Sequence, residues 1–456
     1  MINYNEILKK QRAFFANGKT KDYKYRQSAL KALRESLVYY ENEINDALKK
    51  DLNKAPFETY MTEYGITLQH LSHATHDLKK WMKPKRRKTG INGFPGVSYD
   101  IYDPYGIVLI MSPWNYPIQL TLGALIGAIS SGNCCIVKPS AYSPASSDII
   151  AKIIKRAFPE EYVTTIQGGR AEIQQLLEQR VDYIFFTGSV TVGKQVMEKA
   201  AQHLTPVSLE LGGKSPCIVT ADANVKAAAK NIAFGKILNS GQTCVGPDYV
   251  LVDERIKDQL CTEIAEQFKK MLGDALTNDN YPRIVNEKHF DRLLSLMDGV
   301  TVYCGGGSNR EKLKIEPTVL VNVTNESAVM GEEIFGPLLP VIPYKTLDEA
   351  EAFVLKREKP LALYLFTSSK KTEEIVFKKL SFGGGCVNDT IMHMTTKGLG
   401  FGGVGYSGMG AYHGKHSFET FSHTKGIYKK TLLIELPFRY HPYKPFYLLA
   451  AHKLMK

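Results

Sequence analysis

Apolar side chains recur every three or four residues between positions 24 and 81, for example at Ala29, Leu30, Leu33, Leu37 and Tyr40. This spacing predicts long amphipathic helices in that part of the chain. From residue 106 onward the pattern changes to short continuous apolar runs, each followed by a turn and a helical stretch. The predicted strands are 106–111, 134–137 and 183–186, and the helices that follow them are 117–131, 144–157 and 191–203.

A strand, a turn and a helix repeated three times predict an α/β protein with a Rossmann-like parallel sheet. In such a sheet the turns that follow the strands all open at the carboxyl edge, where ligands bind. The turns here are Ser112-Pro113, Lys138-Pro139 and Thr187-Gly188-Ser189. We therefore expect a dinucleotide at the edge that these three turns share.

A second series of α/β elements starts near Leu209. No internal repeat or low-complexity tract marks the change, so the boundary is inferred only from the rhythm of the elements. The predicted strands of this second part are 216–219, 249–252, 318–323, 338–344 and 362–366, and its first helices are 224–238 and 255–272.

Composition limits the class of protein. The chain has 456 residues, of which 44% are hydrophobic and 23% charged, which is typical of a soluble globular protein with two or three domains. Its seven cysteines are scattered and include no CxxC pair, so we expect neither disulfides nor a metal site, and a reducing cytoplasm as the location. The N-terminus has no secretory segment. The most apolar stretch, 118–129, has about half the length needed to span a bilayer.

The net charge of +12 is densest in Lys83-Pro84-Lys85-Arg86-Arg87-Lys88, which a glycine-containing stretch follows. Nucleic-acid binding requires aromatic side chains between the basic ones or a recognisable module, and neither is present. We therefore expect a solvated connector between domains here and no nucleic-acid partner. The C-terminal stretch 437–456 mixes aromatic, aliphatic and lysine side chains. A weak peripheral contact with an anionic membrane and an arm packed on a neighbouring subunit both fit that mixture.

The candidate nucleophile is Cys244, which lies among small residues between turns expected at Gly241 and Gly246-Pro247. An accessible thiol of this kind can attack a carbonyl carbon when a neighbouring group helps to remove its proton. The alternative is a buried cysteine that acts as a small hydrophobic residue.

Several polar residues fit the same chemistry. Glu210 lies between two leucines, where desolvation would raise its pKa toward that of a general base, or it is a surface glutamate at a strand end. Asn115 lies between two prolines and can donate a hydrogen bond to an oxyanion, or it is an ordinary turn residue. Lys138 either binds ribose hydroxyls or is a surface lysine. The pair Gly188 and Gly193 is a weak phosphate signal without the GxGxxG fingerprint.

Taken together, these segments resemble the aldehyde dehydrogenase superfamily along nearly the whole chain. The resemblance is closer to the short class 3, fatty-aldehyde-type branch, on the evidence of 362–366, 384–389, 402–408 and the tail 436–440. The six matching motifs, in family order, are Pro113-Trp114-Asn115-Tyr116-Pro117, Lys138-Pro139-Ser140, Phe186-Thr187-Gly188-Ser189, Leu209-Glu210-Leu211-Gly212-Gly213-Lys214-Ser215-Pro216, Gly241-Gln242-Thr243-Cys244 and Glu332-Glu333-Ile334-Phe335-Gly336-Pro337.

This resemblance implies that the Cys244 thiolate attacks an aldehyde, and that the Asn115 side chain and the Cys244 backbone N–H bind the oxyanion. Glu210 would activate the water that hydrolyses the resulting thioester to the carboxylic acid. NAD or NADP is the implied hydride acceptor, and no metal is implied. The implied cofactor-binding residues are Lys138, Ser140, Gly188, Ser189, Gly193, Leu211, Glu333 and Phe335. The implied substrate-lining residues, whose aromatic and apolar content favours hydrophobic aldehydes, are Tyr64, Trp114, Tyr116 and His393.

The resemblance also implies a domain division and a homodimer. Residues 1–82 and 105–209 would form the dinucleotide-binding domain, and residues 210–400 the catalytic domain that carries the nucleophile. Residues 83–104 and 401–456 would form a small β bridging and oligomerisation element.

One position departs from the family pattern in a useful way. Many relatives have glutamate directly after Lys-Pro-Ser, where its carboxylate binds the adenosine ribose and repels a 2′-phosphate, whereas this chain has Ala141. We therefore expect NADP to be accepted alongside NAD. Three rival functions stay open: a CoA-acylating aldehyde dehydrogenase, a reductase of acid derivatives, and a non-catalytic structural homologue.

Overall fold

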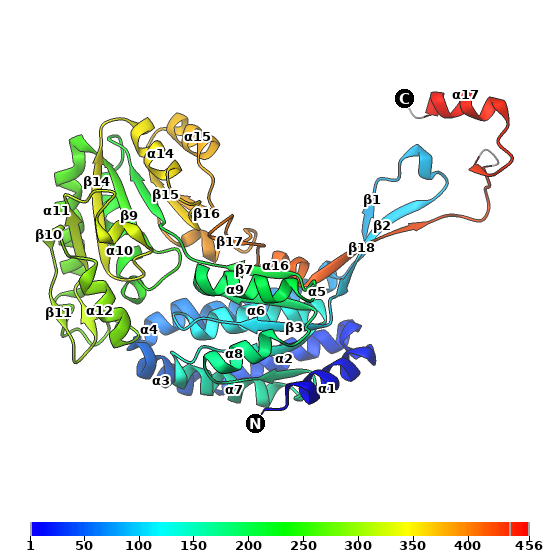
Figure 1. Ribbon diagram of the computed structural model, residues 1–456, viewed down its shortest axis with the longest axis horizontal. Coiled ribbons are helices and arrows are strands. Elements are labelled where there is room, and N and C mark those ends of the chain that lie inside the picture. Colours follow the sequence, from blue (N-terminus) through cyan, green and yellow to red (C-terminus); the bar gives the residue numbers. More distant parts are fainter. Residues whose placement is uncertain (1, 437–438, 455–456) are drawn as a thin grey trace.

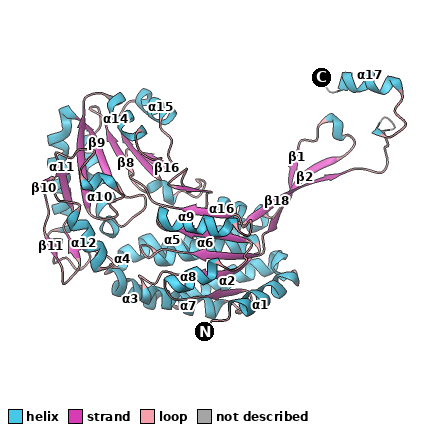
Figure 2. Cartoon of the chain, viewed as in Figure 1, coloured by secondary structure: helices cyan, strands magenta, loops and turns pink. Residues whose placement is uncertain are grey.

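The computed structural model describes residues 2–436 and 439–454. Two lobes, each built around one sheet, lie side by side, and a narrow arm projects from the first lobe (Figure 1). Figure 2 shows helices packed around the sheets in both lobes. The expected α/β fold is confirmed.

The sheet of the first lobe has six strands. Five of them run parallel, and the sixth, β17, pairs antiparallel with β7. In spatial order the strands are β17 (Gly408–Met409), β7 (Val207–Glu210), β6 (Tyr183–Thr187), β3 (Ile107–Met111), β4 (Cys134–Lys138) and β5 (Val163–Thr165).

The register of this sheet aligns the residues from which the site is built. Met111 pairs with Lys138 on one side and with Phe186 on the other, and Thr187 pairs with Glu210. The carboxyl ends of four neighbouring strands therefore lie along one edge, as the alternation of strands and helices predicted.

Helices cover this sheet. The helix after β3, α6 (Pro117–Ser131), is buried over its whole length, which explains why its sequence is apolar on all sides. Pro117 at its first turn and Gly132 in the left-handed conformation after its last turn fix its ends. The other helices of this lobe are α1 (Tyr4–Ala16), α2 (Tyr23–Tyr39), α3 (Glu41–Leu52), α4 (Pro56–Thr59), the π-helical turn η2 (Tyr60–Tyr64), α5 (Gly65–Trp81), α7 (Pro144–Ala157), α8 (Arg170–Leu177), α9 (Val190–Ala201) and α16 (Gly414–Thr420).

The second lobe contains a seven-stranded sheet that is parallel except at β10. Its strands, in spatial order, are β10 (Thr301–Cys304), β13 (Thr318–Val321), β14 (Leu338–Tyr344), β9 (Tyr249–Asp253), β8 (Pro216–Val219), β15 (Ala362–Phe366) and β16 (Gly384–Val387). The small hairpin β11 (Ser308–Asn309) and β12 (Lys314–Ile315) lies beside it. Its helices are α10 (Val225–Ile237), α11 (Lys257–Leu272), α12 (Glu287–Ser295), α13 (Ala328–Gly331), α14 (Leu347–Leu355) and α15 (Lys370–Lys379).

The arm is a three-stranded antiparallel sheet of β1 (Lys85–Arg87), β2 (Val97–Pro104) and β18 (Ser422–Lys429). Helix α17 (Pro445–Leu454) lies beyond its far end (Figure 1). Within the basic run 83–88, Lys85–Arg87 therefore form an exposed edge strand. The segment 401–421 differs from the expected bridging element, because β17 extends the first sheet and α16 packs on α5 and α6.

Parts of the expected C-terminal arm lie outside the described residues, namely 437–438 in the tail 436–440 and residues 455–456. Among the helices that the structure describes, none has the length and apolar character needed to cross a bilayer. Within the same residues, no group of three or more histidine, cysteine, aspartate or glutamate side chains is arranged to hold a metal ion.

Candidate active site

Cys244 follows a strained turn at the end of α10. Three consecutive residues of the turn η4 (Leu238–Gly241), namely Asn239, Ser240 and Gly241, have the positive φ angles of the left-handed region. Two of them carry side chains, so the surrounding hydrogen bonds must hold this conformation. Only glycine fits at the third, because a Cβ there would come within 2.2 Å of the carbonyl oxygen of Gly336.

Side chains on both sides hold this turn. The hydroxyl of Ser240 donates to the carbonyl of Pro282 at 2.5 Å. The side-chain amide of Gln242 donates to the carbonyl of Arg283 at 2.9 Å and accepts from the N–H of Val285 at 3.0 Å. After the cysteine, the Tyr364 hydroxyl donates to the carbonyl of Val245 at 2.5 Å. Cys244 therefore lies on a rigid loop.

Asn115 lies against this loop from the other lobe, between β3 and α6. Its side-chain Nδ2 donates to the carbonyl of Gln242 at 3.0 Å, and its own carbonyl accepts from the side-chain amide of Asn239 at 2.9 Å. A side-chain amide carries two N–H donors, so one remains for a ligand. The structure thus brings Asn115 next to the loop that carries Cys244.

Glu210 ends strand β7 and is almost fully buried. Neither oxygen of its carboxylate has a hydrogen-bond partner among the described residues. Burial raises the pKa of this carboxyl well above its ordinary value, because the charged form loses its hydration. Two unpaired buried acceptors require an occupant such as a water molecule, and a high-pKa carboxyl suits proton transfer from it.

The Cys244 sulfur is close enough to two carboxylates to be affected by their charge. Burial, followed by Glu333 and Glu210, raises the pKa of the Cys244 thiol to about 12, although the backbone N–H groups of Cys244 and Val245 oppose the shift. The protein as described therefore keeps the thiol protonated near neutral pH.

Glu333 lies against the backbone that follows β7. A Cβ on Gly212 would come within 1.9 Å of its Oε2, so the carboxylate rests directly on the backbone after β7. Burial, and next the Asp248 carboxylate, raise the pKa of Glu333 to about 8, while a hydrogen bond from the Gly213 backbone lowers it. Two residues further along the chain, Phe335 has a φ of 49°, which turns the backbone. Its ring meets the Trp114 ring edge-on, with 5.4 Å between the ring centroids.

The residues implied for the cofactor lie along the edge of the first sheet. Lys138 is buried at the end of β4, where its Nζ donates to the carbonyls of Pro139 and Gly168 at 2.8 and 2.6 Å. Ser140 is half-buried in the turn that follows, and its hydroxyl accepts from the Tyr142 N–H at 3.2 Å.

The turn after β6 completes this edge. Ser189 caps α9 by accepting from the N–H of Val192, and the amino end of the helix lies directly after the carboxyl end of β6. Gly188 has no room for a side chain, because a Cβ would meet the Phe186 ring at 2.6 Å. Gly193 is equally restricted by Leu211, whose side chain would lie 2.7 Å from such a Cβ. A cradle of bare backbone and a helix terminus fits a dinucleotide pyrophosphate.

The four residues implied for the substrate are placed differently. The Tyr116 hydroxyl hydrogen-bonds Thr243 at 2.6 Å, directly beside the nucleophile, and Trp114 packs between the rings of Phe335 and His289. The Tyr64 ring is buried and its hydroxyl donates to Glu41 of α3 at 2.9 Å.

His393 lies in the turn η6 (Met392–Thr395). Its Nδ1 is 3.5 Å from the Cys386 sulfur, and its ring lies 6.1 Å from that of Tyr364. Burial lowers the pKa of His393 to about 4, so the ring is neutral near pH 7. Its ring therefore packs, uncharged, near the tyrosine that supports Val245.

Sequence reasoning missed several residues that shape the site. Lys214 donates to Asp248 at 2.5 Å and to the carbonyl of Glu332 at 2.9 Å, and Asp248 accepts from the N–H of Ile334 at 2.9 Å, so this pair fixes the loop of Glu333. Lys214 belongs to one of the six matching motifs, but a charged residue after two glycines gives no indication that it fixes the loop of Glu333. Lys54 and Glu63, described below, carried no signal at all.

Known proteins resemble this chain in sequence and fold. Residues 3–427 match the family model for the aldehyde dehydrogenase family. The 4,4'-diaponeurosporen-aldehyde dehydrogenase of Staphylococcus aureus is 47% identical over 436 residues, which cover 95% of each chain. Aldehyde dehydrogenase family 3 member B1 of Mus musculus is 42% identical, with 97% of this chain and 95% of that protein covered. A solved structure, the substrate-bound state of Staphylococcus aureus AldH, is 44% identical and superposes with a TM-score of 0.97 over both full chains.

The raised pKa of Cys244 has a measurable consequence. We expect its alkylation by iodoacetamide, in the protein without cofactor, to rise about tenfold per pH unit from pH 7 and to reach no plateau by pH 9.5, because the thiolate fraction is still growing. Glu333→Gln removes a negative neighbour, lowers the thiol pKa and speeds the reaction at pH 9. Peptide mass spectrometry measures the modification at residue 244, with Cys244→Ser as the blank. A plateau near pH 8.5 would contradict this electrostatic picture.

Proposed function

The chain belongs to the aldehyde dehydrogenase family and oxidises aldehydes with NAD or NADP, and from this premise we propose that Cys244, Glu210 and Asn115 carry the reaction on hydrophobic aldehydes. The resemblance to class 3 members is confirmed by the relatives described above. The observation that carries the proposal is the buried Glu210 carboxylate, which has no partner among the described residues and lies close enough to raise the thiol pKa.

In the first half of the reaction the Cys244 sulfur bonds to the carbonyl carbon of the aldehyde, and the carbonyl oxygen becomes an oxyanion. The free N–H of the Asn115 side chain and the backbone N–H of Cys244 donate to that oxygen. In comparable sites, one donor of this kind lowers the activation barrier by about 2.7–4 kcal/mol. The proton of the thiol passes to solvent before or during the attack, because only the thiolate is strongly nucleophilic.

In the second half Glu210 accepts a proton from a water molecule, whose oxygen bonds to the thioester carbon as the carbon–sulfur bond breaks. The products are a carboxylic acid and the Cys244 thiolate. A carboxyl with a raised pKa is a stronger base once ionised than an exposed glutamate, which suits this step near neutral pH.

The residues on the sheet edge fit a nicotinamide dinucleotide. The bare backbone at Gly188 and Gly193 and the end of α9 would hold its phosphates, Lys138 and Ser140 its adenosine ribose, and Glu333 its other ribose, with Leu211 and Phe335 packed nearby. The bound cofactor supplies the hydride acceptor that converts the thiohemiacetal on Cys244 to the thioester.

The rival functions are less well supported. A CoA-acylating enzyme or a reductase of acid derivatives has no need for a base that activates water, whereas Glu210 is buried and poised for that role. A non-catalytic homologue would not need to retain an unpaired buried carboxylate, because such a group costs stability.

We also propose that the protein is a homodimer in a reducing cytoplasm. The arm projects away from both lobes (Figure 1), and Ile91, Phe94, Leu432 and Leu433 are exposed on it or just beyond it. A second copy would cover such a surface. All seven cysteines are free, which supports a reducing compartment. The domain division proposed from the sequence is supported by the two sheets, with residues 401–421 assigned to the first lobe.

The mechanism predicts different phenotypes for the nucleophile and the base. Cys244→Ser should lower the rate of aldehyde oxidation by about a thousandfold or more, because a hydroxyl is a far weaker nucleophile. Glu210→Gln should still release about one equivalent of NADH in a burst and then turn over slowly, because hydrolysis of the thioester is blocked. Stopped-flow absorbance measures the burst, and chromatography identifies the product with and without CoA. Preferential formation of acyl-CoA would overturn the hydrolytic mechanism.

Cofactor choice is tested at Ala141, which is exposed. Ala141→Glu should raise the ratio of kcat/KM for NAD to kcat/KM for NADP about tenfold or more, because the new carboxylate accepts from the ribose hydroxyls and repels a 2′-phosphate. Tyr142→Glu, which places the same charge at the neighbouring exposed position, is the matched control and should change the ratio less. If Ala141→Glu leaves the ratio where it was, the argument from this position is wrong.

The substrate class is tested with a graded panel of aldehydes. We expect kcat/KM to rise about threefold to fourfold for each added methylene from acetaldehyde to the medium-chain aldehydes, because each buried CH₂ contributes about 0.8 kcal/mol. The panel should include an aromatic aldehyde and 4,4'-diaponeurosporen-aldehyde, for which one relative is named. A steady fall in kcat/KM with chain length would exclude hydrophobic aldehydes as the preferred class.

A further inference from the structure

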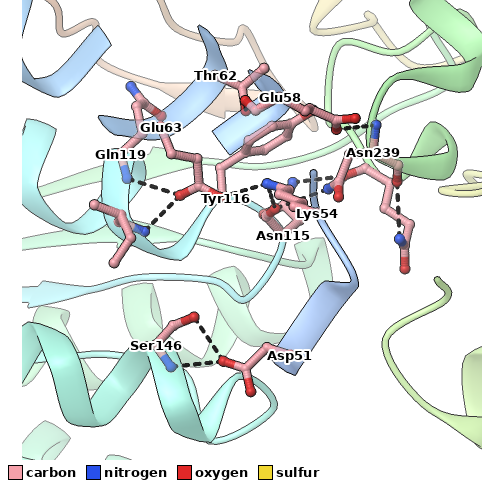
Figure 3. Close-up of polar contacts among 12 residues, drawn as sticks. Asp51, Lys54, Glu58, Thr62, Glu63, Asn115, Tyr116, Gln119, Ser146 and Asn239 are labelled. Carbon is pink, nitrogen blue, oxygen red and sulfur yellow. Dashed lines mark hydrogen bonds and ion pairs between the residues drawn. The ribbon is translucent and has the colours of Figure 1, made fainter. Parts of the chain in front are cut away.

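A fully buried ion pair lies behind the catalytic loops. The Lys54 ammonium is 2.5 Å from the Glu63 carboxylate, and both side chains are 0% exposed. Lys54 follows α3, and Glu63 is in the π-helical turn η2 (Figure 3). Because removing two charges from water costs about as much as their attraction returns, such a pair is poorly explained by stability alone.

The lysine is directed at the backbone of the proposed oxyanion donor. Its Nζ donates to the carbonyl of Asn115 at 2.9 Å and lies 4.0 Å from the centre of the Tyr116 ring (Figure 3). The ammonium has three N–H groups, so it can bind Glu63 and Asn115 at the same time. It contacts the backbone side of Asn115 and none of the reacting groups.

Glu63 holds the other end of the same segment. Its Oε2 accepts from the N–H of Ile118 at 2.8 Å and from that of Gln119 at 3.3 Å, both in the first turn of α6. These are donors that a helix leaves unpaired at its amino end, and a carboxylate is the favourable partner there. The ion pair therefore binds the backbone on both sides of Tyr116-Pro117.

The second lobe meets the pair at the same carbonyl. Asn239 also donates to the carbonyl of Asn115, and its backbone N–H donates in turn to Glu58 at 2.8 Å. Glu58 comes from α4, between Lys54 and Glu63 in the chain. One short stretch of the first lobe thus contacts both the oxyanion loop and the loop that carries Cys244.

We infer that Lys54, held by Glu63, is a positioning residue that fixes the Asn115 carbonyl so that the side-chain amide presents its free N–H to the oxyanion formed at Cys244. This inference rests on the role proposed above for Asn115. An oxyanion donor acts only when it lies about 2.7–3.1 Å from the place that the oxygen will occupy. Loss of the ammonium leaves the carbonyl with one donor and lets the loop shift, and a shift of about 1 Å can cost a hundredfold in rate.

The test is a double-mutant cycle between Lys54→Met and Asn115→Ala. Measured at saturating cofactor, each single substitution should lower kcat/KM for an aldehyde that saturates the wild-type protein. The decrease for Lys54→Met should be about 10-fold to 100-fold. In the Asn115→Ala background, Lys54→Met should lower it by no more than about threefold further, because the group that it positions is gone. Equal factors in both backgrounds would overturn the inference and leave the proposed function intact. Full activity of Asn115→Ala would instead overturn the role proposed for that residue.

A second readout separates positioning from general damage. Alkylation of Cys244 by iodoacetamide forms no oxyanion, so its rate in Lys54→Met should stay within about threefold of the wild-type rate. A fall as large as that in aldehyde oxidation would show that Lys54 acts on the thiol or on the fold, and the inference would fail. If Lys54→Met alone does not fold, Lys54→Met/Glu63→Gln leaves no unpaired buried charge and is carried through the same measurements.

Two control variants match the perturbation without touching Asn115. Lys379→Met removes the lysine partner of another fully buried glutamate, Glu351, in the second lobe. Asp51→Asn alters a buried carboxylate near Lys54 that accepts from the N–H and the hydroxyl of Ser146, at the start of α7 (Figure 3). Both should lower the melting temperature and leave kcat/KM at saturating cofactor within about twofold. A large loss of activity in either control would contradict the specificity claimed for Lys54.

Discussion

The active site depends on two reciprocal hydrogen bonds that join the lobes. The side chain of Asn115 donates to the carbonyl of Gln242, and the side chain of Asn239 donates to the carbonyl of Asn115. Because each loop both donates and accepts, neither can shift without weakening both bonds. The proposed nucleophile is on one loop and the proposed oxyanion donor on the other, so these bonds set the distance on which carbonyl attack would depend. The two sheets and their helices serve to bring these loops together.

Burial sets the pKa values on which the proposed chemistry depends, and it also opposes formation of the thiolate. The same loss of hydration raises the pKa of Cys244, Glu210 and Glu333, and each carboxylate that ionises makes the thiolate harder to form. A high pKa suits the base, since it must accept a proton from water. It opposes the nucleophile, which reacts as the thiolate. The backbone N–H groups of Cys244 and Val245 are the local features that favour the thiolate, and they are fixed by the rigid loop.

The sequence predicted the first sheet well because its strands are continuous apolar runs that end at prolines and glycines. The short strand β5 and the glycine-rich β16 have no such pattern, so their existence could be known only from their pairing. Segment 401–421 was assigned to the bridging element, whereas Gly408 and Met409 within it pair with β7. The candidate site came from motifs, which name the reacting residues but not the groups that hold them. Lys54 and Glu63 look like solvated helix residues, since their burial depends on loops distant in sequence.

The choice of an ion pair at this position follows from the number of groups to be satisfied. Within the part of the chain that the structure describes, the first turn of α6 leaves two buried N–H groups, at Ile118 and Gln119, without main-chain partners, and the Asn115 carbonyl has only the Asn239 side chain as a second donor. An ammonium and a carboxylate supply enough donors and acceptors for all three groups and still bind one another. A pair of apolar residues would pack as well but would leave the two N–H groups unpaired and the carbonyl with one donor. The ion pair therefore allows this loop to be both buried and fixed. The proposed oxyanion site requires both of these properties.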